Sequence, residues 1–232
     1  MKNILYIAAV TLLCSSCFHV NSNWTGGKNA IKGEGAVIAK SFDDLKDFDR
    51  IVINGHADVN FYQSSTYEVT LRTQENILDY VDYRVEGTTL VIETKDKRNI
   101  RAEKYDLVIQ APTLNSVVVN GAADFDIPAG LTVKDDGDLT VEVNGSGDLS
   151  FDHVKCMNLK IQVNGAADVE LESVEVIKTL KVEVNGAGDA EIHGSAGEAS
   201  FSVNGAGAID ARELRVAGEV SKHTSGIAKI QL

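Results

Sequence analysis

The chain has 232 residues, a formal net charge of −12 at pH 7, and 44% hydrophobic residues. The hydrophobic content excludes a disordered polymer, and the negative charge argues against nucleic-acid binding and against direct docking on an anionic membrane. Only two prolines accompany twenty glycines, a composition that suits many strands joined by tight turns.

The N-terminal segment has the pattern of a bacterial export signal. One lysine precedes the apolar run from Ile4 to Leu13, which has the length of a signal-peptide core and is too short to span a bilayer. Two serines then precede Cys17, as in a lipobox, although Cys14 stands where leucine is usual. We predict that residues 1–16 are a lipoprotein signal peptide and that Cys17 carries lipid. An ordinary secretory signal is the alternative.

The segment that follows predicts a tether. Residues 17–35 are polar and rich in Gly and Asn, a composition typical of flexible linkers. Acyl chains on Cys17 would hold the following domain, residues 36–232, at a membrane surface. We expect a location in the cell envelope, anchored in the outer membrane, and the sequence leaves open which face the domain occupies.

The first half of the domain is rich in strands but irregular. Between Gly35 and Pro112, several stretches alternate apolar and polar residues, as half-buried strands do. Residues Glu75 to Tyr80 predict a short helical turn, and the charged stretch from Asp96 to Glu103 predicts a loop. We interpret this part as hairpins or irregular turns of the array described next.

One short pattern then recurs through the chain: apolar–any–apolar–Asn–Gly–small–small–Asp–apolar–polar–apolar. Successive copies from the second onward are spaced by 24, 20, 21 and 19 residues, and a degraded further copy, Ser225-Gly226, follows. A fixed period near 21 residues is typical of a stacked array. The Asn-Gly pairs, which we predict to form structural turns, are Asn54-Gly55, Asn120-Gly121, Asn144-Gly145, Asn164-Gly165, Asn185-Gly186 and Asn204-Gly205.

The residues around each Asn-Gly pair predict how the array folds. Apolar residues stand three and one positions before the Asn and five and seven positions after it, with a polar residue at the sixth. This alternation predicts strand, turn, strand with one face inward, and we expect Asn and Gly to supply the turn because both tolerate positive φ. We predict an all-β fold: a single-stranded right-handed parallel β-helix of Asn-Gly repeats of about 21 residues, with a more irregular N-terminal part. A sandwich of hairpins is the alternative.

An acidic residue follows most Asn-Gly pairs at the fourth position after the Asn, and these residues form the sharpest candidate site. Acids stacked on neighbouring repeats repel one another unless they are neutralised, hydrogen-bonded or solvated. One hypothesis is that these acids form a column of ligands for a cation, with Ca²⁺ as the ion. The other is that each acid accepts backbone N–H groups within its own turn, in which case we expect no cofactor. The column comprises Asp58, Asp124, Asp148, Asp168 and Asp189.

A second acidic row stands at the sixth position after the Asn, on strands that we expect to be exposed. It is interpreted either as a solvated face that resists edge pairing or as an adhesive surface for cations, cationic partners or sugars. Its acidic members are Asp126, Glu170, Glu191 and Asp210.

The pattern of these residues resembles the head GIN domain "putative auto-transporter adhesin" family, over about Val37 to Leu232. The resemblance rests on the recurring repeat and on the Ala-Pro step within Ile109–Leu114. It implies a β-helix fold, and the family contains many lipoproteins of gut-type Gram-negative bacteria, but its adhesin label brings no binding residues. Asn replaces the family's commoner Ser before Gly, and Ala208 and Lys229 stand where Asp is expected.

From these observations we predict a lipid-anchored binding or adhesion module without catalysis. Its partners would be the membrane, through Cys17, and a polysaccharide or protein ligand at the cell surface. The five histidines occupy unlike repeat positions and no nucleophile–base motif is present, which weighs against the alternative of a polysaccharide lyase or hydrolase. A purely structural envelope protein is the third hypothesis.

Overall fold

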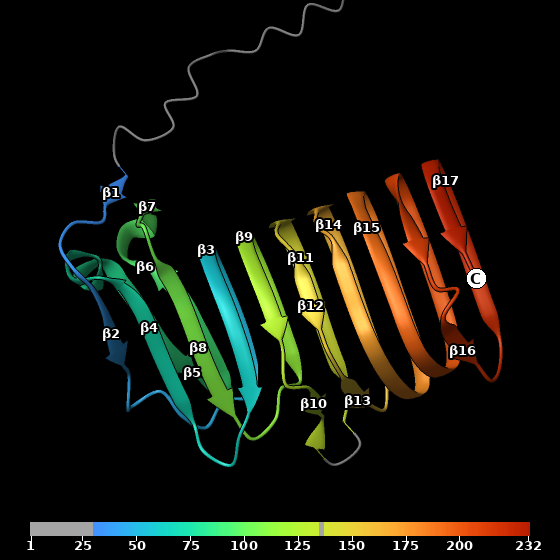
Figure 1. Cartoon of the computed structure of the whole chain (residues 1–232), viewed down its shortest axis with the longest axis horizontal. Helices are drawn as coiled ribbons and strands as arrows, with labels where there is room; N and C mark the ends of the chain where they lie inside the picture. The colour runs from blue at the N-terminus through green and yellow to red at the C-terminus, as the bar shows by residue number, and fades with distance from the viewer. Residues whose placement is uncertain (1–29, 135–136) are drawn as a thin grey trace, which may run out of the picture.

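The computed structural model describes residues 30–134 and 137–232, and these fold mainly as β-structure (Figure 1). Helical structure is limited to short 3-10 turns such as η1 (Glu75–Tyr80) and η2 (Lys95–Lys97), and η1 confirms the predicted helical turn. The strands are β1 (Ile31–Lys32), β2 (Val37–Ser41), β3 (Arg50–Gln63), β4 (Glu68–Gln74), β5 (Val81–Glu86), β6 (Thr89–Thr94), β7 (Ile100–Arg101), β8 (Tyr105–Ala111), β9 (Ser116–Ile127), β10 (Leu131–Thr132), β11 (Leu139–Ser146), β12 (Leu149–Phe151), β13 (Val154–Cys156), β14 (Leu159–Ala166), β15 (Val169–Asp210), β16 (Leu214–Val216) and β17 (Val220–Gln231).

Successive repeats pair in parallel and in register. β3 pairs with β9, β9 with β11, β11 with β14, β14 with β15, and β15 with β17, so that the Asn-Gly pairs lie beside one another along the stack. Figure 1 shows these strands following one another along the long axis in chain order. The parallel pairing confirms an all-β parallel arrangement and rules out a sandwich of antiparallel hairpins for this part of the chain.

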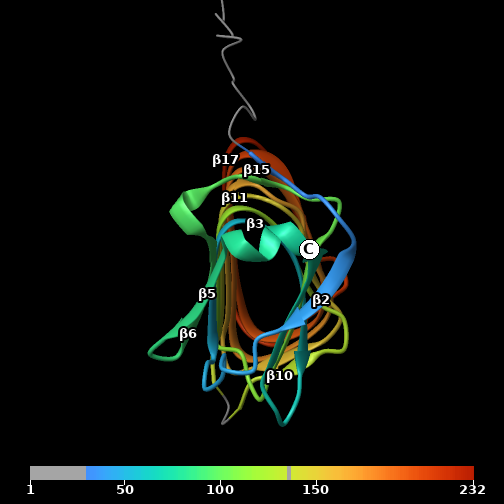
Figure 2. The same cartoon turned by 90° about the vertical axis from the view of Figure 1, so that its left-hand side faces the viewer.

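The core runs through the middle of the stack. Figure 2, which looks from the N-terminal end, shows the strands curving around an oval interior. Side chains alternate across a strand, and the apolar positions predicted to face inward are buried, with Phe125 and Phe151 in edge contact at a centroid distance of 6.4 Å. Cys156, in β13, is also buried. The inward columns therefore hold the repeats together by apolar burial.

The Asn-Gly pairs do not form turns between strands. Each lies inside a continuous parallel ladder, and β15 passes through one such pair near its middle and through another near its end. The glycines have positive φ, for example 145° at Gly186, but the asparagines do not. The expectation that Asn serves as a positive-φ turn residue was therefore wrong: Gly alone supplies the bend, and Asn has the separate role described below.

The irregular N-terminal part closes one end of the stack. β6 and β8 continue the parallel pairing with β3, whereas β2–β4, β4–β8 and β5–β6 are antiparallel pairs. The helical turn η1 lies across this end in Figure 2, with Ile77 fully buried beneath it. This arrangement confirms the predicted mixture of hairpins and array, and it covers the apolar interior as a capping segment does in other repeat proteins.

The charged stretch predicted as a loop is mostly irregular, with short ordered pieces. It includes part of η2 and the two-residue strand β7, which pairs in parallel with β1. At the other end of the stack, β17 is exposed along most of its length, and Ile227 is 86% exposed. The signal peptide predicted for residues 1–16, the lipidated Cys17 and most of the 17–35 tether lie outside the described residues.

Candidate functional site

The asparagines of the repeats form a continuous ladder of side-chain hydrogen bonds. In each step the Nδ2 of one Asn donates to the Oδ1 of the Asn in the preceding repeat, as side-by-side amides do in stacked β-structures. The donor–acceptor distances lie between 2.9 and 3.1 Å from Asn54 to Asn204. All the amides point the same way, so each hydrogen bond polarises the next. We call this row the Asn ladder.

A carboxylate caps the N-terminal end of the Asn ladder. Asn54 donates through Nδ2 to Oε2 of Glu93 in β6 at 3.2 Å, and Arg84 in β5 donates to the other oxygen at 2.6 Å. The Arg84 hydrogen bond is the main reason that the pKa of Glu93 lies below its usual value. A negative group therefore meets the donor end of the aligned amides, where it is favourable.

The predicted Asp column forms a straight row beside the ladder, but the acids bond differently from either hypothesis. Asp124 accepts the backbone N–H of Asp148 at 3.0 Å, Asp168 accepts that of Asp189 at 2.8 Å, and Asp189 accepts that of Ala208 at 2.7 Å. These bonds join neighbouring repeats, so the hypothesis of bonds within each turn was wrong for these three acids.

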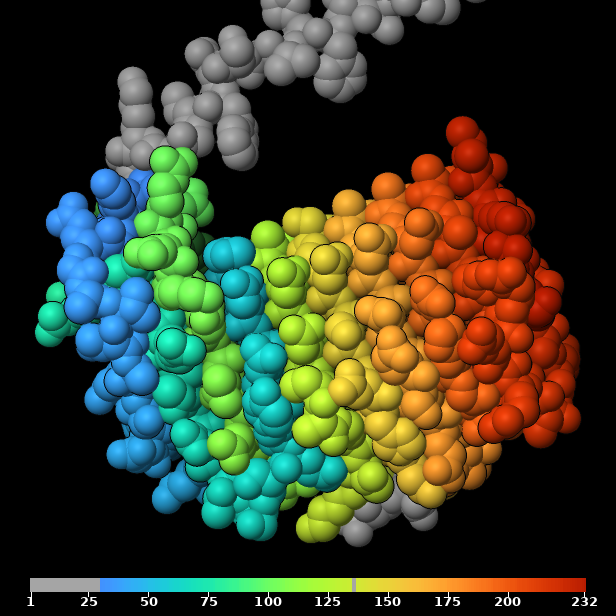
Figure 3. All heavy atoms as spheres, viewed as in Figure 1, coloured from blue at the N-terminus to red at the C-terminus, as the bar shows by residue number. Residues whose placement is uncertain are grey.

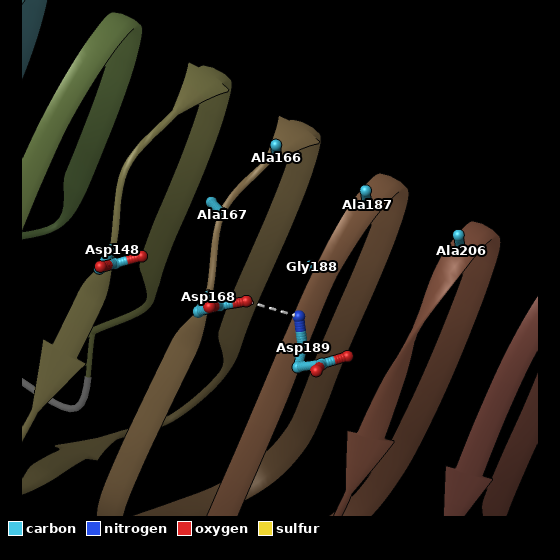
Figure 4. A pocket seen from close by; sticks show the side chains of 8 residues that line it. All are labelled: Asp148, Ala166, Ala167, Asp168, Ala187, Gly188, Asp189 and Ala206. Carbon is cyan, nitrogen blue, oxygen red and sulfur yellow. Dashed lines mark hydrogen bonds between the residues drawn. The ribbon is translucent and has the colours of Figure 1, made fainter.

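Between the Asn ladder and the Asp column lies a shallow groove with a floor of small side chains. Figure 4 shows Asp148, Asp168 and Asp189 in a row along one side, with alanines along the other. The groove has a volume of about 410 Å³. Its lining residues, which we call the Asp groove, are Asp148, Ala166, Ala167, Asp168, Ala187, Gly188, Asp189 and Ala206.

Close stacking of the backbone explains why these floor residues are small. A Cβ at Gly188 would lie less than 3.0 Å from the carbonyl oxygen of Ala167 in the preceding repeat, and real Cβ atoms essentially never come that close. Larger side chains at the neighbouring positions would fill the groove. The small residues of the repeat thus keep the row of acids accessible along the stack.

The second acidic row lies next to the Asp column on the outward faces of the strands. Burial, and then repulsion from Asp124 and Asp58, raises the pKa of Asp126. Hydrogen bonding with Glu172, followed by burial, raises the pKa of Glu170. Both shifts have the sign expected where acids crowd together. The two rows therefore make one strongly negative face.

This negative face ends toward the C-terminus. Arg212 binds Asp210 with both Nε and Nη2, and this pairing lowers the pKa of Asp210 to about 2. In the preceding repeat, Nε2 of His193 lies 3.1 Å from Oε1 of Glu191. The last two repeats also carry Ala208 and Lys229 in place of Asp. The uncompensated acids are thus concentrated in the middle repeats.

Neither the acids nor the cysteine of the described chain forms a metal or nucleophile site. Within residues 30–134 and 137–232, no group of three or more His, Cys, Asp and Glu side chains is placed to hold a metal ion. Burial, and secondarily Asp138, raises the pKa of Cys156 to about 12, so its thiol stays protonated and unreactive at neutral pH. The geometry gives the calcium hypothesis no support.

Comparison with known proteins decides the family. No curated protein matches the chain, but residues 47–232 match the family model described as "Putative auto-transporter adhesin, head GIN domain". The chain belongs to the head GIN domain family. This match confirms the resemblance seen in the repeats and covers most of the described residues.

Solved structures share the fold of this head GIN domain. A "putative adhesin" from Parabacteroides distasonis is 25% identical with a TM-score of 0.71, covering 87% of this chain and 84% of that one. One from Bacteroides fragilis is 21% identical with a TM-score of 0.67, covering 87% and 99%. A "putative lipid binding protein" from P. distasonis is 20% identical with a TM-score of 0.51, covering 88% and 100%.

Two features of the site were missed in the sequence. The cap formed by Glu93 and Arg84 comes from a hairpin outside the repeat, so no periodic signal marks it. The hydrogen bonds between acids of neighbouring repeats depend on parallel pairing in register. The sequence pattern alone was compatible with antiparallel hairpins as well, so it did not predict these bonds.

The helices of the described head GIN domain are all too short to cross a membrane.

Proposed function

We propose that this head GIN domain protein is a lipid-anchored binding or adhesion module of the cell envelope that performs no catalysis. Its domain, residues 36–232, would be a single right-handed parallel β-helix. The in-register parallel pairing of successive Asn-Gly pairs supports a coil, and the general preference of parallel connections for the right hand supports its handedness. Neighbours described as putative adhesins support a binding role.

The observation that carries the proposal is the Asp groove. Its acids repeat at the spacing of hydrogen-bonded strands, about 4.8 Å, and each lies beside an open, small-residue floor. The regular array presents these charges on rigid strands, so little conformational entropy is lost on binding. Such a row fits an extended partner that carries cationic groups, for example a lysine-rich segment of a surface protein.

The absence of catalysis is supported by where the acids lie. Glu170 and Glu172 hydrogen-bond to each other, which brings them closer than the separation of about 5–9.5 Å between the two carboxyl groups of glycosidases. Neither residue lines the Asp groove or the larger cavity near the N-terminal end, and a hydrolase or lyase needs its acids inside a cleft that holds the substrate. The regular surface suits binding better than bond cleavage.

The anchor is proposed from the sequence of the N-terminal segment: a signal peptide over residues 1–16, lipid on Cys17 and a tether to residue 35, placing the domain at the outer membrane. A Cys17→Ser variant tests it. Cell fractionation should find the wild type with membranes and the variant in the soluble fraction. Equal membrane association of the two proteins would refute the lipid anchor.

Binding through the Asp groove is tested with a fluorescent oligolysine peptide and the full-length protein. We expect fluorescence anisotropy to show binding that weakens as salt rises, because salt screens exposed charges. The double variant Asp168→Asn/Asp189→Asn should bind about tenfold more weakly or worse, since charged hydrogen bonds are worth about 1.5–3 kcal/mol each. Asn keeps an oxygen that can accept the backbone N–H, so the fold is preserved.

The matched control is Asp43→Asn/Asp44→Asn, which removes the same charge from a segment outside the repeats. This control should retain the wild-type affinity. An equal loss in both double variants would mean that net charge, and not the Asp groove, governs binding. No binding by the wild type would refute a cationic partner.

A further inference from the structure

A basic segment interrupts this acidic protein near its N-terminal end. Residues 95–101 hold four cationic side chains and one acid, a net charge of +3 (4 − 1), in a chain of net charge −12. The segment comprises η2, β7 and the residues between them. Figure 3 shows this green segment projecting beyond the upper end of β3, with a notch on its side toward β3 and β9.

The notch has a volume of about 810 Å³, larger than that of the Asp groove. We call it the basic pocket. It exists because no earlier repeat stacks on the bend that the first Asn-Gly pair makes in β3. A Cβ at Gly55 would meet nothing within 4 Å, whereas a Cβ at Gly121 would clash with the backbone of Gly55. Its lining residues are Ala30, Asn54, Gly55, His56, Glu93, Thr94, Lys97, Arg98, Asn99, Ile100, Arg101, Asn120, Gly121, Ala122 and Ser146.

The electrostatic balance of the basic pocket is positive. Its one acid, Glu93, is already paired with Arg84 at 2.6 Å and hydrogen-bonded to Asn54. In the described part of the chain, neither Lys97 nor Arg101 forms an ion pair within 4.0 Å. The charges of Lys97 and Arg101 are therefore available to a ligand in the pocket.

The backbone of the segment is held in an unusual conformation. Asp96 and Lys97 have φ values of 55° and 51°, and the only other non-glycine residue with positive φ in the described chain is Asp47. Two consecutive left-handed residues are an unfavourable backbone conformation for side chains other than glycine. Such outliers are concentrated at ligand clamps and functional loops. Here the positive φ values of Asp96 and Lys97 turn the segment back toward Gly55 in β3, where the segment closes one side of the pocket.

The remaining lining defines the kind of ligand. Asn99, Asn120, Thr94 and Ser146 also line the pocket, and its volume lies in the range of about 300–1,000 Å³ that holds small ligands. The Thr94 hydroxyl donates to the carbonyl oxygen of Arg98 at 2.7 Å, and the Asn120 amide keeps one N–H beyond its ladder bond. His56 is fixed by a hydrogen bond of 3.0 Å between Nδ1 and the carbonyl oxygen of Ala122. Neutral amides and hydroxyls suit sugar hydroxyl groups, and guanidinium and ammonium groups suit a carboxylate or phosphate.

We propose that the basic pocket binds an anionic saccharide, with Lys97 and Arg101 contacting its carboxylate or phosphate group. This site is separate from the Asp groove, and the two share no lining residue. The proposal therefore stands or falls independently of binding to a cationic partner. It gives the protein two surfaces of opposite charge at different points along the stack.

Isothermal titration calorimetry of the full-length protein tests this site. The probes are digalacturonate, its uncharged galactose disaccharide counterpart and galactose 1-phosphate. We expect at least one charged probe to bind and the uncharged disaccharide to bind at least about tenfold more weakly, a factor that corresponds to about 1.4 kcal/mol. The double variant Lys97→Gln/Arg101→Gln should lose charged-probe binding by at least about the same factor.

The matched control is Lys46→Gln/Lys160→Gln, which removes the same charge elsewhere and should bind as the wild type does. Failure of every charged probe to bind, or equal losses in both double variants, would overturn the proposal. Vesicles of phosphatidylglycerol and of phosphatidylcholine form a further arm. Binding to the anionic vesicles that depends on Lys97 and Arg101, without saccharide binding, would overturn the saccharide assignment in favour of a lipid headgroup.

Discussion

The tight stacking of the Asn-Gly corners makes a sharp prediction about two glycines. Gly55 and Gly186 occupy the same repeat position and have similar positive φ values, 130° and 145°. An alanine at either position costs about 1–2 kcal/mol for its left-handed backbone. Only at Gly186 does the new Cβ also lie less than 3.0 Å from the carbonyl oxygen of the preceding repeat, Gly165.

That clash adds to the cost of Gly186→Ala. The contact is with backbone, so no rotamer change relieves it, and overpacking of this kind costs about 1–3 kcal/mol. Forcing the repeats apart also weakens the ladder bonds of Asn185, each worth about 0.5–1.5 kcal/mol. We expect a loss of about 3–5 kcal/mol for Gly186→Ala and about 1–2 kcal/mol for Gly55→Ala.

Thermal unfolding followed by far-UV circular dichroism measures the difference. For a chain of this size, each kcal/mol shifts Tm by about 2–4 °C, so Gly186→Ala should lower Tm by several degrees more than Gly55→Ala. Gly205→Ala, with a φ of 143° and a clash against Gly186, should behave like Gly186→Ala. Equal losses at Gly55 and Gly186 would contradict a stacking clash at Gly186, because backbone strain alone would then explain both.

Three further predictions concern the polar rows. Asn164→Ala removes two ladder bonds and should lower the free energy of urea unfolding by about 1–2 kcal/mol. The control Asn60→Ala, which replaces an outward Asn outside the ladder, should change that free energy by less than about 0.5 kcal/mol. Equal losses in the two variants would exclude a stabilising ladder. Asp126 has a raised pKa, so the folded chain binds this proton more tightly than the unfolded chain and loses stability as pH rises through that pKa. Asp126→Asn should therefore stabilise by up to about 1 kcal/mol at pH 7 and give no gain below the unfolded pKa of about 3.9; a gain that persists in acid would contradict the electrostatic cause. Calcium should raise Tm no more than magnesium does, and a calcium-specific rise that EDTA reverses would support the cation hypothesis instead.

The repeat pattern predicted much of this fold because its period and its alternation are both local properties of the sequence. The spacing of about 21 residues indicated stacked copies, and the apolar positions around each Asn-Gly pair correctly marked the inward faces. The pattern did not reveal why Asn is used. Its role depends on a neighbour in another repeat, and only the parallel register brings the amides into line.

The candidate sites were predicted less completely than the fold. The Asp column was recognised as a row, but its bonds to the next repeat were not, because an acid at this position can accept a local N–H equally well. The basic pocket was not foreseen. Its cationic residues lie in a segment predicted only as a charged loop, and the sequence does not indicate that this segment folds back over Gly55.

The proposed binding role is tested most directly by locating the contact between the protein and a cationic partner. Carbodiimide joins a lysine amine to a carboxylate only when the two groups touch, so it can be applied to the full-length protein with the oligolysine peptide and followed by peptide mass spectrometry. We predict cross-links concentrated on Asp148, Asp168 and Asp189. Cross-links spread evenly over exposed acids, or concentrated at Asp43 and Asp44, would contradict a binding surface at the Asp groove.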